Sequence, residues 1–151
     1  KISANNNNDY ESIMIKIIGD RIAEAMAEKM HESVRKEFWG YNSKEKLSNS
    51  DLIRERYMGI RPAPGYPACP DHSEKAKIWE LLDIKNNSKM KLTESYAVSP
   101  ASSVTGWYFS HPNSKYFAVN RISNEQLKDY SARKGLSEEN LKKIFPHILQ
   151  E

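Results

Sequence analysis

Apolar residues recur at helical spacing through the first part of the chain. Between Tyr10 and about Phe38 they fall mostly three or four positions apart, at Ile13, Met14, Ile17, Ile18, Ile22, Ala25, Met26, Met30 and Val34. Because residues three and four apart lie on one side of a helix, this spacing predicts a long amphipathic helix. Gly40 follows the pattern and is a typical residue for a helix end.

The opposite side of this predicted helix is polar and acidic. Asp20, Glu24 and Glu28 are four positions apart and therefore stand one above another. Two interpretations fit this arrangement. Either neighbouring lysine and arginine side chains neutralise the acids on a solvated face, or the acids form a polar surface that receives a partner.

Local start and stop signals predict four shorter helices. Serine and aspartate side chains cap helix starts, and glycine commonly ends helices. The predicted ranges are Ser48 or Ser50 to about Tyr57, Asp71 to about Asp83, Ser123 to Lys134, and Ser137 to about Leu149.

Strand-forming residues gather in the second half of the chain. Lys91 to Val98 is predicted to form a strand that Pro100 ends. Val104 to Ser110 and Lys115 to Ile122 flank a short turn, so they are predicted to pair as an antiparallel hairpin. Helices and strands are segregated along the chain. The predicted fold class is therefore α+β, with an antiparallel β-sheet, a long amphipathic helix and several shorter helices packed around it.

A proline-rich loop, residues 60–75, reads IRPAPGYPACPDHSEK. Each proline fixes its own φ and restricts the residue before it, so the loop should be extended and rigid. Such a loop would hold Arg61, Tyr66 and the backbone near Gly65 in one geometry around a ligand. Arg61 offers a planar fork of donors suited to a carboxylate or phosphate. The alternative is a plain connector with a solvated arginine.

Four stretches together carry a resemblance to a known family. They are DYESIMIKIIGDRIAEAMAEKMHESVRKEFWGY (Asp9 to Tyr41), Arg61-x-x-x-Gly65-Tyr66-Pro67-Ala68-Cys69-Pro70-Asp71-His72, KLTESYAVSPASSVTGWYFSHPNSKYFAV (Lys91 to Val119) and DYSARKG (Asp129 to Gly135). In this order they resemble the activation domain of cobalamin-dependent methionine synthase. Residues 1–8 are then expected to be a linker or disordered start, and residues 9–151 the C-terminal part of that domain.

The resemblance implies a site for S-adenosylmethionine. Arg61 would pair with the ligand's carboxylate, and backbone groups from Gly65 to Ala68 would meet the adenine. The strand that carries Tyr116 and Phe117 would line the same groove, one residue by its backbone and the other by packing. The implied binding residues are Arg61, Gly65, Tyr66, Ala68, Tyr116 and Phe117. From the residues alone, ordinary sheet packing accounts for the aromatic side chains.

The resemblance also implies a reaction, reductive methylation of oxidised cobalamin, within the methyltransferase that completes methionine biosynthesis. Cobalamin would be bound by another domain of the full enzyme, and this fragment would have no catalytic residue of its own. Asp20, Arg21 and Glu24 are the implied contacts with the cobalamin-binding domain. A flavodoxin-like protein or a reductase is the implied electron donor. The alternative is a ligand-free scaffold that docks on a cobalamin-binding module.

Composition narrows the remaining function classes. The 151 residues, 38% hydrophobic and 28% charged, suit one compact domain, and no run reaches the roughly 18 apolar residues of a membrane helix. A net charge of +3, spread along the chain, is weak support for a nucleic-acid binder. A single cysteine, Cys69, fits a reducing cytoplasm. The four histidines show no metal-ligand spacing, so no metal site is expected.

Overall fold

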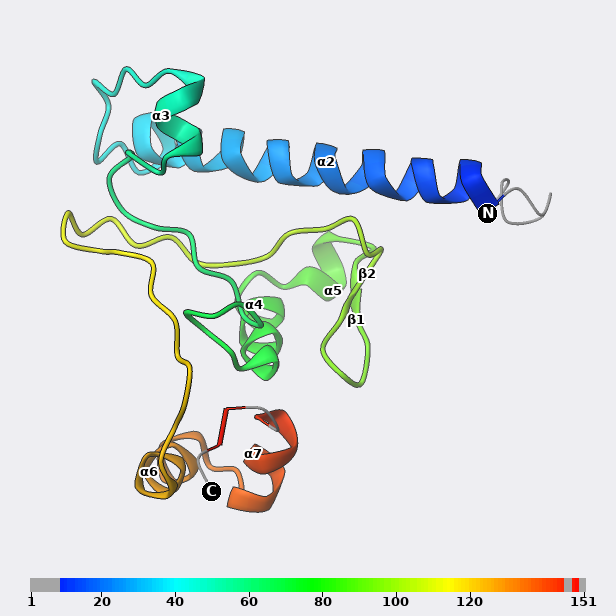
Figure 1. Cartoon of the computed structure of the whole chain (residues 1–151). Helices are drawn as coiled ribbons and strands as arrows, with labels where there is room; N and C mark the ends of the chain where they lie inside the picture. The colour runs from blue at the N-terminus through cyan, green and yellow to red at the C-terminus, as the bar shows by residue number, and fades with distance from the viewer. Residues whose placement is uncertain (1–8, 146–147, 150–151) are drawn as a thin grey trace.

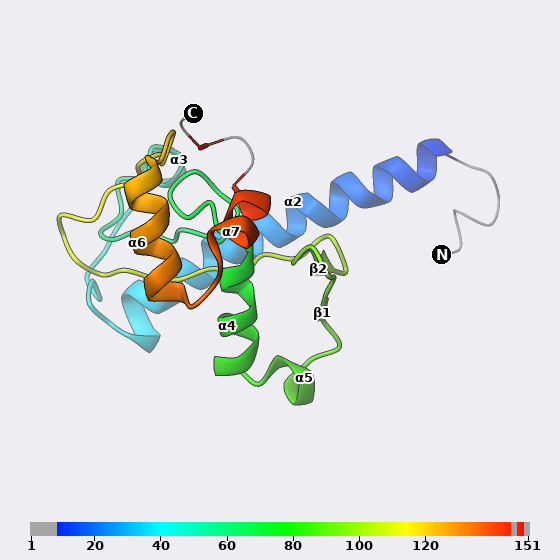
Figure 2. The same ribbon diagram turned by 90° about the horizontal axis from the view of Figure 1, so that it is seen from below.

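The computed structural model describes residues 9–145 and 148–149. A long helix crosses one side of the molecule, extended segments and a small sheet lie next to it, and a pair of helices lies at the far end (Figure 1). Figure 2 views the molecule from below, with this helix pair in front of the long helix. The class is the expected mixture of helices with an antiparallel sheet, although the sheet has only two short strands.

The long predicted helix is confirmed. Helix α2 spans Asp9–Ser33 and runs directly into a π-helical turn, η1, at Val34–Phe38. The wider turn ends with the Trp39 N–H, which donates to the carbonyl of Val34 at 3.0 Å. Gly40 then adopts a φ of +71°, a left-handed conformation that costs glycine little, and so ends the helix as predicted.

The shorter helices begin where the capping signals predict. Ser48 caps α3 and Ser123 caps α6, each through a capping box, and Ser137 caps α7. Asp71 caps a 3-10 turn, η2, that leads into α4. The bounds are α3 Asn49–Ile53, η2 His72–Glu74, α4 Lys75–Leu81, α5 Ile84–Asn87, α6 Asn124–Lys134 and α7 Glu138–Ile144.

Two predicted helix ends were too late. Helix α3 stops at Ile53 because Glu55 turns the chain with a φ of +53°, and Tyr57 beyond it is buried rather than helical. Helix α7 stops at Ile144, since Phe145 leaves the helical conformation. Further along, Leu149 forms an isolated bridge with Ile122.

The strand predicted from Lys91 to Val98 was wrong as a single element. Its ends form two strands, β1 at Lys91–Leu92 and β2 at Val98–Ser99, which pair with each other antiparallel. Residues 93–97 turn back between them, and the Thr93 N–H donates to the carbonyl of Ala97 at 2.9 Å.

The predicted hairpin of residues 104–110 with residues 115–122 was also wrong. Within the described residues these segments pair with the proline-rich loop instead of with each other. Trp107 N–H donates to the Pro62 carbonyl at 2.9 Å, and Val119 N–H donates to the Pro67 carbonyl at 2.8 Å. Prolines lack a donor but keep a strong acceptor, so the loop receives hydrogen bonds on both sides. It is thereby held between the two segments.

Helices α6 and α7 enclose their own apolar core, built on Leu127, Leu141 and Phe145. Charged groups connect this pair to the rest. Lys134 of α6 forms ion pairs with Asp71 and Glu74, and all three side chains are largely buried. The far end of the molecule is thus attached next to the proline-rich loop.

Candidate functional site

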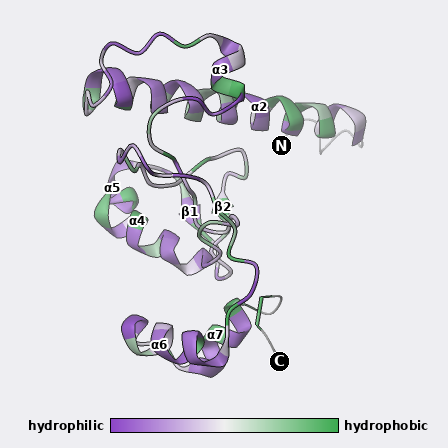
Figure 3. Cartoon of the chain, turned by 60° about the vertical axis from the view of Figure 1, so that its left-hand side comes forward, coloured by the Kyte–Doolittle hydropathy of each residue, from purple (hydrophilic) through white to green (hydrophobic). Residues whose placement is uncertain are grey.

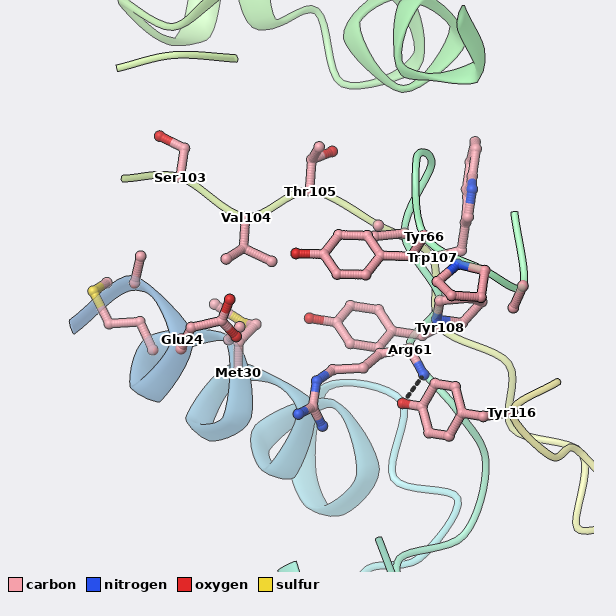
Figure 4. Close-up of a pocket in the computed structure, with 18 of the residues that line it drawn as sticks. Glu24, Met30, Arg61, Tyr66, Ser103, Val104, Thr105, Trp107, Tyr108 and Tyr116 are labelled. Carbon is pink, nitrogen blue, oxygen red and sulfur yellow. Dashed lines mark hydrogen bonds between the residues drawn. The ribbon is translucent and has the colours of Figure 1, made fainter. Parts of the chain in front are cut away.

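A cavity of about 640 Å³ lies between α2, the proline-rich loop and residues 102–108. This volume falls in the range of small-molecule sites, which is roughly 300–1,000 Å³. Figure 4 shows Glu24 and Met30 rising from α2 toward Val104, with Tyr66, Tyr108 and Tyr116 on the other elements. The walls are therefore largely apolar and aromatic, with a few charged groups.

Most of the expected binding residues meet at this cavity. Arg61, Tyr66 and Ala68 line it from the loop, and Tyr116 and Phe117 line it from the later segment. Sequence segments more than 40 residues apart are brought together by the hydrogen bonds between the loop and residues 107–119.

Gly65 is absent from the residues that line the cavity. Its φ is +98°, and a Cβ atom there would lie 2.2 Å from Cε1 of His72. Glycine is therefore required at this position by the backbone conformation and by the packing of the His72 ring.

Arg61 is fixed by several partners. Its Nη2 donates to Glu28 Oε2 at 2.6 Å, and its Nη1 donates to Tyr57 Oη at 3.0 Å and to His31 Nδ1 at 3.1 Å. The backbone N–H of Arg61 donates to Tyr116 Oη at 3.0 Å, the contact drawn in Figure 4. Three of the five guanidinium N–H donors of Arg61 are thus used within the described residues, so the Nε–H and the second N–H of Nη2 remain available for a ligand.

His31 supports Arg61 from a fully buried position. Burial, together with the positive charges of Arg35 and Arg61, lowers the pKa of His31 to about 3. The ring is therefore neutral at physiological pH. Because its Nδ1 accepts from Arg61, its Nε2 must carry the hydrogen, which points to Tyr41 Oη at 3.4 Å.

Several backbone N–H and carbonyl groups of the proline-rich loop form hydrogen bonds with each other. Gly65 N–H donates to the Cys69 carbonyl at 2.7 Å, and Cys69 N–H donates to the Tyr66 carbonyl at 2.9 Å. In contrast, neither the N–H nor the carbonyl of Ala68 makes a hydrogen bond among the residues that the structure describes. Ala68 lines the cavity, so its donor and acceptor are free for the edge of a heterocyclic base.

The three residues predicted to contact a cobalamin-binding domain occupy different positions on α2. Glu24 lines the cavity, and Asp20 lines an adjoining pocket, where it accepts a hydrogen bond from Ser102 Oγ at 2.7 Å. Arg21 is exposed and is not among the residues lining the cavity. Glu24 therefore belongs to the ligand side of the site more directly than the sequence indicated.

Several lining residues were missed by sequence analysis. Ser103, Val104 and Thr105 form one wall, but Val104 and Thr105 were attributed to a hairpin strand and Ser103 directly precedes it. Met26 and Met30 contribute from α2, where their spacing indicates only an apolar helix side. No local signal in the sequence distinguishes such wall residues from ordinary packing residues.

In the described ranges, 9–145 and 148–149, no group of three or more His, Cys, Asp or Glu side chains is placed to hold a metal ion. No helix within those ranges is both long and apolar enough to cross a membrane.

Comparison with known proteins identifies the family of this chain. The sequence profile of "Vitamin B12 dependent methionine synthase, activation domain" matches residues 2–135. The chain belongs to this family. A solved structure, "Crystal Structure of the MetH Reactivation Domain bound to AdoHcy", is similar to it with a TM-score of 0.95 and 54% sequence identity. The match covers 99% of this chain and 46% of that one, so this chain spans less than half of that relative.

Proposed function

We propose that this activation-domain chain binds S-adenosylmethionine in the cavity and presents its methyl group for reductive methylation of cobalamin. The observation that carries the proposal is that the Arg61 guanidinium and the Glu24 carboxylate line the same cavity. An amino-acid end of a ligand carries a carboxylate and an ammonium, and these two side chains complement them. The related reactivation domain bound to AdoHcy supports the same ligand class.

The rest of the cavity suits the nucleoside end of that ligand. Tyr66, Trp107, Tyr108 and Phe117 supply aromatic surface for an adenine ring and a sulfonium cation. Ala68 offers a free backbone donor and acceptor for the edge of adenine. The rigid loop keeps these groups in place before the ligand arrives, which lowers the entropy lost on binding.

This chain contributes binding and orientation to the reaction. Cobalamin, held by another domain of methionine synthase, supplies in its reduced form a strongly nucleophilic cobalt that accepts the methyl group. Arg61 and Glu24 would fix the amino-acid end of the methyl donor. The methyl carbon on its sulfonium would then point toward the cobalamin-binding domain. No side chain here needs to act as a general acid or nucleophile.

The surface around Asp20 is the expected docking place for the cobalamin-binding domain. Asp20 accepts a hydrogen bond from Ser102 and lines a pocket together with Glu24, and Arg21 is exposed on the same helix. These polar groups would contact the arriving domain, while a flavodoxin-like protein or a reductase supplies the electron. The setting proposed for this reaction, as part of cobalamin-dependent methionine synthase, is the cytoplasm.

Calorimetric titration with S-adenosylmethionine tests the proposal. The parent chain and a control, Glu125→Gln on the exposed surface of α6, should bind equally well. Glu24→Gln keeps the shape but removes the charge that faces the ammonium, so binding should weaken about tenfold, as expected for a lost charge-assisted hydrogen bond of about 1.5 kcal/mol. A folded parent chain that binds no S-adenosylmethionine would contradict the proposal and favour a ligand-free scaffold.

A further inference from the structure

Polar side chains fill the junction between the C-terminal end of α2, the turn η1 and the residues that precede the proline-rich loop. Figure 3 shows that this end of α2 is mostly hydrophilic. His31 and Arg35 are fully buried in the junction, and Tyr57 is only 6% exposed. Buried polar groups must satisfy one another, so the direction of each hydrogen bond here is set by its neighbours.

The ring of Tyr57 is held by three side chains. The His31 ring lies edge-on to it with the centroids 4.8 Å apart. The guanidinium carbons of Arg35 and Arg61 lie 4.6 Å and 5.4 Å from the centroid of the Tyr57 ring. None of these contacts uses the hydroxyl group, so a phenylalanine at this position would keep them.

The hydroxyl group of Tyr57 joins two partners. It lies 3.0 Å from Arg61 Nη1 and 3.3 Å from Tyr116 Oη. A guanidinium can only donate, so Tyr57 accepts from Arg61. Burial and the contact with Tyr116 raise the pKa of Tyr57, so its hydroxyl keeps its hydrogen at physiological pH. That hydrogen has one acceptor among the described residues, Tyr116 Oη, and Tyr57 therefore donates to Tyr116.

The hydroxyl group of Tyr116 is left with a free donor. It accepts from the backbone N–H of Arg61 at 3.0 Å, the contact drawn in Figure 4, and it also accepts from Tyr57. Both of its lone pairs are then used, whereas its own hydrogen has no acceptor within the part of the chain that the structure describes. Tyr116 lines the ligand cavity and is 38% exposed. Its O–H is thus available to a ligand, as are the free N–H donors of Arg61.

We propose that Tyr57 is a positioning residue, which turns the hydroxyl hydrogen of Tyr116 toward the carboxylate of the bound ligand. Tyr57 is not among the residues that line the cavity, so it acts through Tyr116. A carboxylate only accepts hydrogen bonds and therefore needs groups that donate into the site. A chain of hydrogen bonds that starts at a guanidinium polarises each hydroxyl along it and strengthens the last donor. The inference rests on the proposed function, because it concerns the recognition of that ligand's carboxylate.

Calorimetric titration with S-adenosylmethionine and with its decarboxylated form tests the inference. Tyr57→Phe removes the hydroxyl and keeps the ring. It should weaken binding of S-adenosylmethionine about tenfold, as expected for a lost hydrogen bond to a charged group, and binding of the decarboxylated form by less than about twofold. Tyr10→Phe, at an exposed tyrosine near the start of α2, is the matched control and should bind both ligands like the parent chain.

A double variant shows whether Tyr57 acts through Tyr116. Tyr116→Phe should also weaken binding of S-adenosylmethionine about tenfold. Tyr57→Phe/Tyr116→Phe should then bind no more weakly than Tyr116→Phe alone, because the second change removes a group that no longer has anything to position. Additive losses, or losses of equal size for both ligands, would overturn the inference.

Thermal unfolding of each variant shows whether it is folded. If Tyr57→Phe does not fold, Tyr116→Phe decides, and an unchanged preference of that variant for S-adenosylmethionine over the decarboxylated form would rule the inference out. A parent chain that binds neither ligand contradicts the proposed function and this inference with it. A parent chain that prefers S-adenosylmethionine, together with a folded Tyr57→Phe that keeps the preference, contradicts this inference alone.

Discussion

Arg61 is ordered before any ligand binds. Three side chains, Glu28, His31 and Tyr57, hold its guanidinium, and Tyr116 holds its backbone. Burial alone would lower the pKa of Arg61, but Tyr57 and Glu28 raise it above its usual value. A fork that is already charged and fixed loses little entropy when it pairs with a carboxylate. The affinity of the site thus depends on this network as well as on Arg61.

The neutral state of His31 makes the stability of the chain depend on pH. Its pKa is about 3 in the folded chain and about 6.5 when unfolded. Between these values the unfolded chain binds a proton that the folded chain excludes. The free energy of unfolding should therefore fall as pH falls from 6.5 toward 3, by at most about 1.4 kcal/mol per pH unit from this residue.

Chemical denaturation at pH 7 and pH 5 measures this dependence. His31→Gln has no titrating group at this position, so its stability should change less between the two pH values than that of the parent chain. His111→Gln, an exposed histidine outside the core, serves as the control and should behave like the parent. Identical pH dependence in the parent and His31→Gln would show that His31 does not cause the effect.

A side chain added at Gly65 should disturb the proline-rich loop. Gly65→Ala places a Cβ atom against the ring of His72, at a φ of +98°. The loop must shift, so both stability and affinity for S-adenosylmethionine should fall. Gly135→Ala is the matched control, because it has a φ of +71° with open space around it. It should cost only about 1 kcal/mol, from backbone conformation.

The double variant Gly65→Ala/His72→Ala distinguishes two causes of the loss: the clash of the new Cβ atom with the His72 ring, and the strain of a non-glycine residue at a positive φ. Removal of the His72 ring should restore part of the lost affinity if the collision displaces the loop. If the double variant binds as weakly as Gly65→Ala, the proposed cause is wrong. Isothermal calorimetry on all four proteins gives the comparison.

At the scale of secondary structure, helices were predictable and strand partners were not. Helix starts depend on neighbouring residues, such as the Ser123 and Gln126 capping box, and helix ends on residues such as Gly135. Strand pairing depends on distant segments. Trp107 finds its partner at Pro62, and this contact leaves no signal in the local sequence of either residue.

Helix α6 is joined to the proline-rich loop by buried charges. Lys134 neutralises Asp71 and Glu74, and Tyr130 donates to Asp71 Oδ2 at 2.6 Å. The ion pairs raise the pKa of Lys134 despite its burial. Lys134→Met would leave two carboxylates close together without a counter-charge, so the free energy of unfolding should fall by about 3 kcal/mol.

Denaturant titration checks this prediction. Lys128→Met, an exposed lysine on the same helix, should change stability by less than about 0.5 kcal/mol. The double variant Lys134→Met/Asp71→Asn should recover part of the loss, because one unpaired charge is gone. Equal stability of Lys134→Met and Lys128→Met would mean that the buried charges do not hold α6 in place.

At the scale of the whole molecule, the sequence predicted residues that line the cavity but not how the chain encloses it. The loop carrying Arg61, Tyr66 and Ala68 was found from its motif, and the structure places all three at the cavity. The helical periodicity of α2 was also found. Periodicity cannot tell which side faces the rest of the chain, and here the α2 side chain that is fully buried is a polar one, His31. That orientation is set by tertiary contacts.

The most direct test of the account compares two ligands on two proteins. S-adenosylmethionine and its decarboxylated form, which lacks only the carboxylate, are titrated into the parent chain and into Arg61→Lys. The parent should prefer S-adenosylmethionine at least tenfold, and Arg61→Lys should lose most of this preference, because lysine cannot form the bidentate pair. Equal binding of both ligands by the parent would contradict the assignment of Arg61 and of the site built around it.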